Sequence, residues 1–166
     1  MMETVAMSPN DIRAALESIP FPVTVVTVGR GGVESGLVVS WLCQASFEPP
    51  MVVFSLSRRH YSEEILRSTK TFVVNVLGED QKAIVGRFAQ QSKAGVDKFQ
   101  GLSTREAPGG GRILDDALCW LDCEVEAIHP AGDHLLVVGK VLDASVKKQG
   151  AALTTASGLH YKQPKP

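Results

Sequence analysis

The feature that most constrains the fold is a series of short apolar runs joined by tight turns rather than by long helices. The β-branched run VTVVTV at residues 23–28 leads into a glycine-rich turn, and the chain then returns over residues 33–41. Further strands are predicted at residues 51–56, 71–77, 121–127 and 134–146. These six strands do not alternate with long helices, so a closed antiparallel barrel is favoured over a parallel sheet.

Three short helices are expected at the periphery of this barrel. Ser8 is expected to cap the first helix and Ser62 the second, because serine side chains accept from free N–H groups at helix starts. The third helix is expected to open at Glu79. Residues 89–111 are rich in glycine and polar residues and are read as a long loop. Lys98 and Phe99 are its candidate ligand contacts, and a surface loop without function is the alternative.

Composition and charge narrow the class of protein. The chain has 166 residues, enough for one domain that spans residues 1–166. Its formal net charge of −1 argues against nucleic acid as a partner, because binding phosphates requires a basic surface. No apolar run approaches the length of a membrane span, so no membrane association is expected. The N-terminus lacks the pattern of a signal peptide, and a cytoplasmic location is therefore expected.

Common catalytic and metal-binding motifs are absent from the sequence. It contains no Rossmann or P-loop glycine motif, no GxSxG elbow and no HExxH. The three cysteines, Cys43, Cys119 and Cys123, are expected to be reduced packing thiols. The four histidines are scattered, so no metal site is predicted.

Residues 57–62, SRRHYS, form a segment that we call the basic turn. Arginine forks bind phosphate with two hydrogen bonds, and free N–H groups at a helix start also bind anions. The segment places both the arginines and the free N–H groups at the expected start of the second helix. A solvated turn without a ligand is an equally good interpretation from these residues alone.

Residues 38–46, which we call the ring strand, could lie against a flat heterocycle. Ser40, Ala45 and Ser46 are small, Trp41 could flank a ring, and Gln44 can both donate and accept hydrogen bonds. An edge strand with exposed polar positions is the alternative. Farther along the chain, His134 follows Gly132 and Asp133 at a turn, where an oriented histidine could contact a cofactor or a substrate.

These segments, in this order, resemble the flavin reductase-like family of FMN-binding split barrels. The resemblance rests on the GLVVSW strand with its SFEPP corner, the SRRHYS turn, FVVNVL, DKF, the LDDALCWLDC strand, AGDH, GKVLDA and GLHY. It runs from about residue 11 to residue 161 and implies a mainly β fold, a six-stranded antiparallel Greek-key split barrel with short peripheral helices. It also implies a homodimer with the flavin near the subunit interface.

The resemblance also assigns roles to residues. Along the isoalloxazine ring it places Val38, Val39, Ser40, Trp41, Gln44, Ala45 and Ser46. Around the ribityl phosphate it places Ser57, Arg58, Arg59, Tyr61 and Ser62. It places His134 near the nicotinamide and the flavin, and Tyr161 where an aromatic residue closes the site.

The implied activity is transfer of electrons from NADH or NADPH through FMN, with FAD as the other flavin, to free flavin, ferric iron or a partner protein such as a monooxygenase. Val38 and Ser40 stand where many short flavin reductases carry Thr and Asn, which favours tightly held FMN. A flavoredoxin-like electron carrier with little NAD(P)H turnover is the alternative. A split barrel that binds haem or pyridoxal phosphate is a third possibility.

Overall fold

The computed structural model describes residues 8–58 and 60–159 and shows a mainly antiparallel β protein. The first half of the chain forms α1 (Pro9–Glu17), β1 (Thr24–Arg30), β2 (Val33–Val39), β3 (Leu42–Ser46), β4 (Met51–Ser57), α2 (Tyr61–Thr69) and β5 (Thr71–Val76). The second half forms η1 (Glu79–Gln81), α3 (Lys82–Phe88), β6 (Thr104–Glu106), β7 (Arg112–Leu114), β8 (Cys119–Ala131), β9 (His134–Val146) and η2 (Thr155–Ser157).

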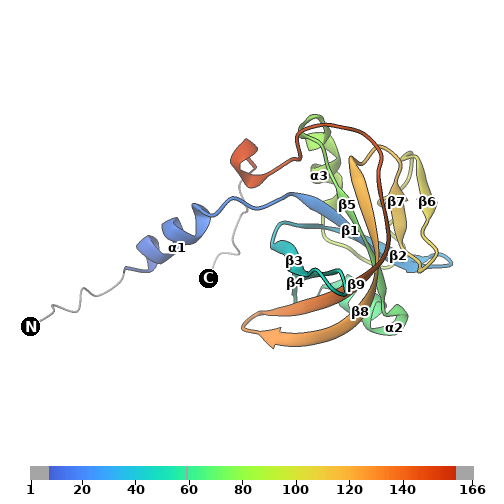
Figure 1. Ribbon diagram of the computed structural model, residues 1–166, viewed down its shortest axis with the longest axis horizontal. Helices are drawn as coiled ribbons and strands as arrows, with labels where there is room; N and C mark the ends of the chain where they lie inside the picture. Colours follow the sequence, from blue (N-terminus) through green and yellow to red (C-terminus); the bar gives the residue numbers. More distant parts are fainter. Residues whose placement is uncertain (1–7, 59, 160–166) are drawn as a thin grey trace, which may run out of the picture.

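Seven strands form one antiparallel sheet in the order β2-β1-β5-β8-β9-β4-β3, and β6 pairs with β7 in a separate two-stranded sheet. The predicted fold class is confirmed. Within the described residues, β2 and β3 are the two edges of the hydrogen-bonded ladder, so the barrel is split, as the family resemblance implies, and not closed, as the strand pattern alone suggests. Figure 1 shows the strands wrapping around a common interior.

The strand count differs from the expected six, since nine strands occur in the described ranges. The pattern of residues 38–46 predicts one strand that continues β2, but the pairing with β1 ends at Val39 and β3 pairs with β4 from Leu42. Residues 89–111 are predicted to be loop, although β6 lies within them. Strands of three residues, such as β6 and β7, are too short to produce an alternating pattern.

The hairpin between β1 and β2 has the geometry that its glycines predict. Gly31 and Gly32 both have positive φ angles, of 64° and 87°. A two-residue turn of this kind matches the twist of the strands that it joins. The cap of the first helix is also confirmed, because the backbone N–H of Asn10 donates to Ser8 Oγ over 3.2 Å.

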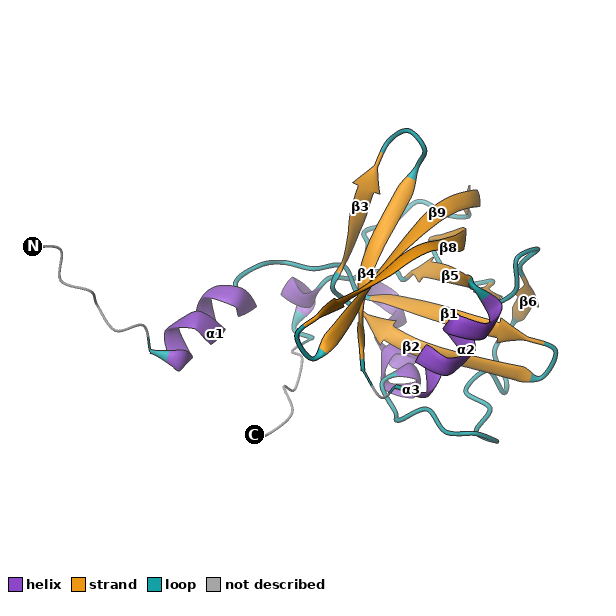
Figure 2. Ribbon diagram, turned by 90° about the horizontal axis from the view of Figure 1, so that it is seen from below, coloured by secondary structure: helices purple, strands orange, loops and turns teal. Residues whose placement is uncertain are grey.

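Two apolar clusters stabilise the barrel from opposite faces of the sheet. Alternate residues of the strands fill the interior, among them Val26, Leu37, Phe54, Phe72 and Val137. The outer face of β1 and β2 is covered by α3 and by the segments around residues 99 and 153. Helix α2 packs against β1 and β2 across the open side of the barrel (Figure 2).

The first helix and the C-terminal segment leave the barrel at one junction. Val23 N donates to Leu153 O over 2.8 Å, and Thr155 N donates to Phe21 O over 2.9 Å. An isolated bridge between Pro22 and Thr154 lies between these bonds. Beyond this junction α1 stands apart from the barrel, with none of its residues buried (Figure 1).

The interior leaves no room for a side chain at Gly139 of β9. A Cβ atom there would lie 2.3 Å from Cζ of the fully buried Phe72. We expect Gly139→Ala to lower the free energy of unfolding by about 1–3 kcal/mol, because the ring and the strand must separate. Urea unfolding monitored by circular dichroism measures this loss.

The matched control is Gly86→Ala in α3. Its Cβ would meet nothing within 4 Å, and the position is helical. This variant is expected to gain about 0.5–1 kcal/mol, since alanine favours the helix. A Gly139→Ala variant as stable as the native chain would show that β9 does not approach Phe72 this closely.

Candidate functional site

The pairing of β4 with β9 brings the basic turn next to His134. Their register places Ser57 opposite His134, and Arg58 N donates to Asp133 O over 3.1 Å. The last residues of β4 and the first residues of β9 therefore form one end of the sheet.

The ring strand reaches the same end of the sheet through Trp41. Ser55 N donates to Trp41 O over 2.9 Å, which holds the step between β2 and β3 beside β4. The indole of Trp41 lies against the imidazole of His134, with ring centroids 4.9 Å apart and an interplanar angle of 49°. The fold thus brings together three segments that the sequence singled out separately.

His134 is oriented by its neighbour in the turn. Its Nδ1 lies 2.7 Å from Asp133 Oδ1. The hydrogen bond from His134, and after it the charge of the imidazole, lowers the pKa of the Asp133 carboxyl below its ordinary value. Asp133 is therefore a carboxylate near neutral pH and can only accept.

The start of α2 is capped by His60 and not by Ser62, so the predicted cap was wrong. His60 Nδ1 accepts from Ser62 N over 3.2 Å. Ser62 is buried one residue inside the helix, and its hydroxyl donates to Ser35 Oγ on β2 over 2.8 Å. Both residue types can cap a helix, and the earlier helix start decided between them.

The remaining residues of the basic turn have different surroundings. Ser57 is exposed, and its hydroxyl donates to Arg58 O over 3.2 Å. Tyr61 is partly buried and packs against the interior cluster. Arg59 and Tyr161 lie outside the described residues.

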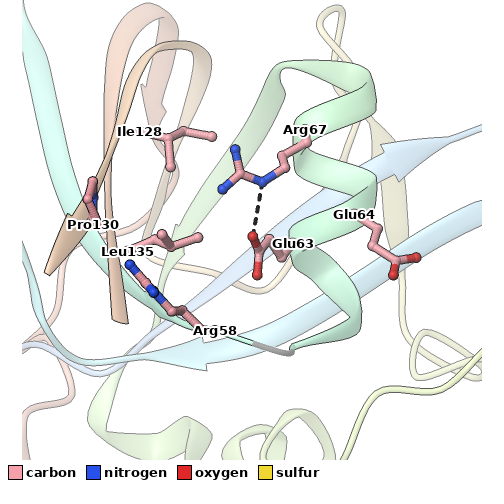
Figure 3. A pocket seen from close by; sticks show the side chains of 7 residues that line it. All are labelled: Arg58, Glu63, Glu64, Arg67, Ile128, Pro130 and Leu135. Carbon is pink, nitrogen blue, oxygen red and sulfur yellow. Dashed lines mark hydrogen bonds and ion pairs between the residues drawn. The ribbon is translucent and has the colours of Figure 1, made fainter. Parts of the chain in front are cut away.

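A pocket of about 750 Å³ adjoins the basic turn, between α2 and the hairpin of β8 and β9. Its lining consists of Arg58, Glu63, Glu64, Arg67, Ile128, Pro130 and Leu135. Figure 3 shows the guanidinium groups of Arg58 and Arg67 directed into this space and Glu64 directed away from it. Arg67 Nε also pairs with Glu63 Oε1 over 2.9 Å.

The ring strand presents both exposed and buried positions. Gln44 and Ala45 are exposed, and Gln44 Nε2 donates to Ser46 O over 3.2 Å. The side chain of Val39 is buried in the interior cluster. Ser40 Oγ is buried and has no hydrogen-bond partner within the described residues.

Lys98 and Phe99 are both engaged by the protein itself. The ammonium of Lys98 is buried and donates to Gly36 O, Phe88 O, Gln90 O and Ser92 Oγ. Burial lowers the pKa of this group to about 8. Phe99 packs against Phe88 in the outer cluster, with centroids 5.4 Å apart. The two residues thus fasten the long loop to β2 and α3.

Sequence reasoning missed the role of His60. It belongs to the basic turn but was not assigned to the site. Burial, and after it the positive charge of Lys98, lowers the pKa of His60 below its ordinary value of 6.5. No local signal pointed to this role, because histidine is not among the residues preferred at helix N-caps.

In residues 8–58 and 60–159, no cluster of three or more His, Cys, Asp or Glu side chains is suited to a metal ion. None of the helices in these ranges combines the length and the apolar character that crossing a bilayer requires.

The split barrel, with Trp41 of the ring strand, the basic turn and His134 at one end, defines a fold of the flavin-binding class. Residues 16–163 match the flavin reductase like domain, so the chain belongs to this family.

Individual relatives agree with this assignment. The chain is 34% identical over 149 residues to a flavin reductase of Pseudomonas putida. The aligned residues make up 89% of this chain and 86% of that relative. It is 33% identical over 140 residues to the reductase subunit HsaB of a flavin-dependent monooxygenase of Rhodococcus jostii, covering 84% and 70%. The Streptomyces globisporus C-1027 NADH:FAD oxidoreductase SgcE6, solved in complex with NAD and FAD fragments, has a TM-score of 0.83 and 25% identity over 97% of both chains.

The cap of α2 predicts a pH-dependent stability. Because the pKa of His60 is lower in the folded chain than in the unfolded chain, the unfolded state binds protons first as the pH falls. The free energy of unfolding of the native chain should therefore decrease as the pH falls through the pKa that His60 has in the unfolded chain, and then through its lower pKa in the folded chain. Protonation of Nδ1 also removes the acceptor for Ser62 N.

The control is His60→Asn, which keeps a capping oxygen but does not titrate in this range. Urea unfolding of both proteins at about pH 7.5 and about pH 5.5 measures the difference. The native chain should lose more stability than the variant. Equal losses in the two proteins would contradict the assignment of His60 as a buried neutral cap.

Proposed function

We propose that this chain is an NAD(P)H:flavin oxidoreductase that binds FMN, with FAD as the second candidate. Electrons would pass from NADH or NADPH through the flavin to free flavin, ferric iron or a partner protein. The observation that carries the proposal is the contact between Trp41 of the ring strand and His134, beside the basic turn. This contact groups Trp41, the expected phosphate contacts and the expected nicotinamide contact at one end of the sheet, whereas Gln44 and Ser46 lie beside the other end of β4.

The ring strand suits a flavin. Ser40 Oγ is a buried hydroxyl without a partner in the described residues, so it is available to a heterocycle edge. Exposed Gln44 can both donate and accept. The proposed ring contacts are Val38, Val39, Ser40, Trp41, Gln44, Ala45 and Ser46, with Val39 contributing its backbone because its side chain is in the core.

The basic turn suits a phosphate. Arg58 is exposed and directs its guanidinium into the neighbouring pocket (Figure 3). The proposed phosphate contacts are Ser57, Arg58, Arg59 and Tyr61, of which Arg59 remains a prediction outside the described residues, as does Tyr161 at the ring. Ser62, Lys98 and Phe99 are not proposed as contacts, because the protein already engages all three side chains.

The residues of this chain bind and orient, whereas a bound flavin supplies the hydride-accepting chemistry. His134 is proposed to orient the nicotinamide. No acid or base is assigned to it, because hydride transfer to a flavin does not require one.

We further propose a homodimer and a redox partner protein. Apolar side chains are exposed beside the site, where Trp41, between β2 and β3, is 44% exposed and Leu136 of β9 is 37% exposed. Phe47, at the corner that lies at the other end of β3 and β4, is 87% exposed. Exposed apolar surface next to a site is typical of a subunit contact. The monooxygenase reductase subunit among the relatives supports a partner that consumes reduced flavin.

Anaerobic mixing of the FMN-loaded protein with NADH or NADPH tests the reductase function. We expect the flavin absorbance to bleach within seconds with at least one nucleotide, since the donor would bind beside the flavin. A yellow protein that does not bleach would contradict the reductase and favour the electron carrier. A chain that binds no flavin after addition of FMN would contradict both.

Removal of the charge of Arg58 tests the phosphate contact. We expect Arg58→Gln to weaken FMN binding by about tenfold or more, because a hydrogen bond between charged groups is worth about 1.5–3 kcal/mol. Riboflavin, which lacks the phosphate, should bind almost unchanged. Fluorescence titration measures both affinities, and Arg13→Gln on the separate helix α1 is the control. Equal weakening of FMN and riboflavin would show that Arg58 does not hold the phosphate.

A further inference from the structure

The pocket beside the basic turn has a continuous apolar surface along the β8–β9 hairpin, which we call the apolar floor. Pro130 and Leu135 lie directly opposite each other in this hairpin. Ile128 lies two residues before Pro130, so its side chain is on the same face of the strand. All three line the pocket of about 750 Å³. This volume suits an organic ligand, because small-molecule sites measure roughly 300–1,000 Å³ and have mainly apolar walls.

The apolar floor faces away from the contact between Trp41 and His134. His134 and Leu135 are consecutive in β9, so their side chains point to opposite faces of the sheet. Arg58 stands at the end of the sheet, where its N–H donates to Asp133 O, and its guanidinium is directed into the pocket (Figure 3). A ligand with two ring systems joined by a charged linker has the shape that would occupy both faces.

Two guanidinium groups bring positive charge to the space above the apolar floor. Arg58 follows β4, Arg67 lies in the last turn of α2, and both are directed into the pocket (Figure 3). Of the two carboxylates that line the pocket, Glu64 is directed away from it and Glu63 is paired with Arg67. The pocket therefore presents a net positive charge to a ligand.

Arg67 is only partly engaged by its ion pair. Its Nε lies 2.9 Å from Glu63 Oε1, and within residues 8–58 and 60–159 neither of its terminal Nη groups donates a hydrogen bond. A guanidinium carries five N–H donors in a planar fork, so the donors of both Nη groups remain for a phosphate. Helix α1 carries a similar pair between Arg13 Nε and Glu17 Oε1, at 2.8 Å, and this exposed pair is a matched reference.

We propose that this pocket is a subsite for the adenylate half of a dinucleotide, with Arg67 on a phosphate and the purine against the apolar floor. The inference rests on the proposed function, which places the other half of the ligand on the opposite face of the sheet. Arg58, between the two faces, then holds the phosphate that joins the halves. FAD and the nicotinamide nucleotides share this adenylate chemistry.

Titration of the full chain with ADP tests the subsite without turnover. We expect Arg67→Gln to weaken ADP binding about tenfold, because charge-assisted hydrogen bonds to a phosphate are lost. Arg13→Gln, in the matched pair on α1, should leave the affinity unchanged. Calorimetry measures these affinities. A native chain that does not bind ADP, or one that binds it no better than Arg67→Gln does, would overturn the proposal.

Two further variants separate the phosphate contact from the purine contact. Glu63→Gln releases Arg67 from its ion pair and removes a negative charge, so ADP should bind about two- to fivefold more tightly. Ile128→Ala removes part of the apolar floor and should weaken ADP about threefold or more, without changing the affinity for inorganic diphosphate. Weaker ADP binding in Glu63→Gln, or equal losses of ADP and diphosphate in Ile128→Ala, would contradict the assigned contacts and overturn the proposal.

Flavin titrations and kinetics identify which dinucleotide uses the subsite. If it is FAD, Arg67→Gln should weaken FAD about tenfold and leave the FMN affinity and the KM for NAD(P)H unchanged. If it is a nicotinamide nucleotide, that KM should rise about tenfold and both flavin affinities should stay the same. No change in any of the three would overturn the proposal. A chain that binds ADP through Arg67 but does not oxidise NAD(P)H would support the subsite and contradict the reductase function.

Discussion

The pairing of β4 with β9 is the interaction on which the rest of the structure depends. It joins the β3–β4 hairpin to the remaining five strands, and its register runs from Met51 opposite Lys140 to Ser57 opposite His134. Side chains alternate between the two faces of a strand, so a shift of one residue would turn His134 into the interior and Leu135 outwards. The same ladder therefore determines both the apolar interior and the composition of the candidate site.

Two buried polar contacts fasten α2 and the long loop to β2. Ser62 on α2 bonds Ser35 on β2, and Lys98 bonds the backbone of Gly36 one residue farther along the same strand. The start of α2 and the long loop are thus fastened to neighbouring positions of β2. This explains why the charge of Lys98 acts on His60, although the two residues are distant in sequence. The basic turn is therefore held against β2 by buried hydrogen bonds.

Much of the fold could be predicted from local patterns in the sequence. The two glycines of the first hairpin, the cap at Ser8 and the extent of β9 all depend on a few neighbouring residues. The division between β2 and β3 could not be predicted, because it depends on the pairing of Leu42 with Phe54. The contact of Trp41 with His134 and the burial of Lys98 also arise only when distant segments meet. Sequence therefore indicated which residues were of interest, whereas the partners of those residues required the structure.

The junction at residues 21–23 and 153–155 has a mechanical consequence. Hydrogen bonds in both directions make the two chain segments a short two-stranded ribbon at the edge of the barrel. The helix α1 extends from one strand of this ribbon, and η2 follows directly on the other. A force or a binding event that displaces one segment must strain or break the bonds to the other. The two segments are therefore expected to move together relative to the barrel.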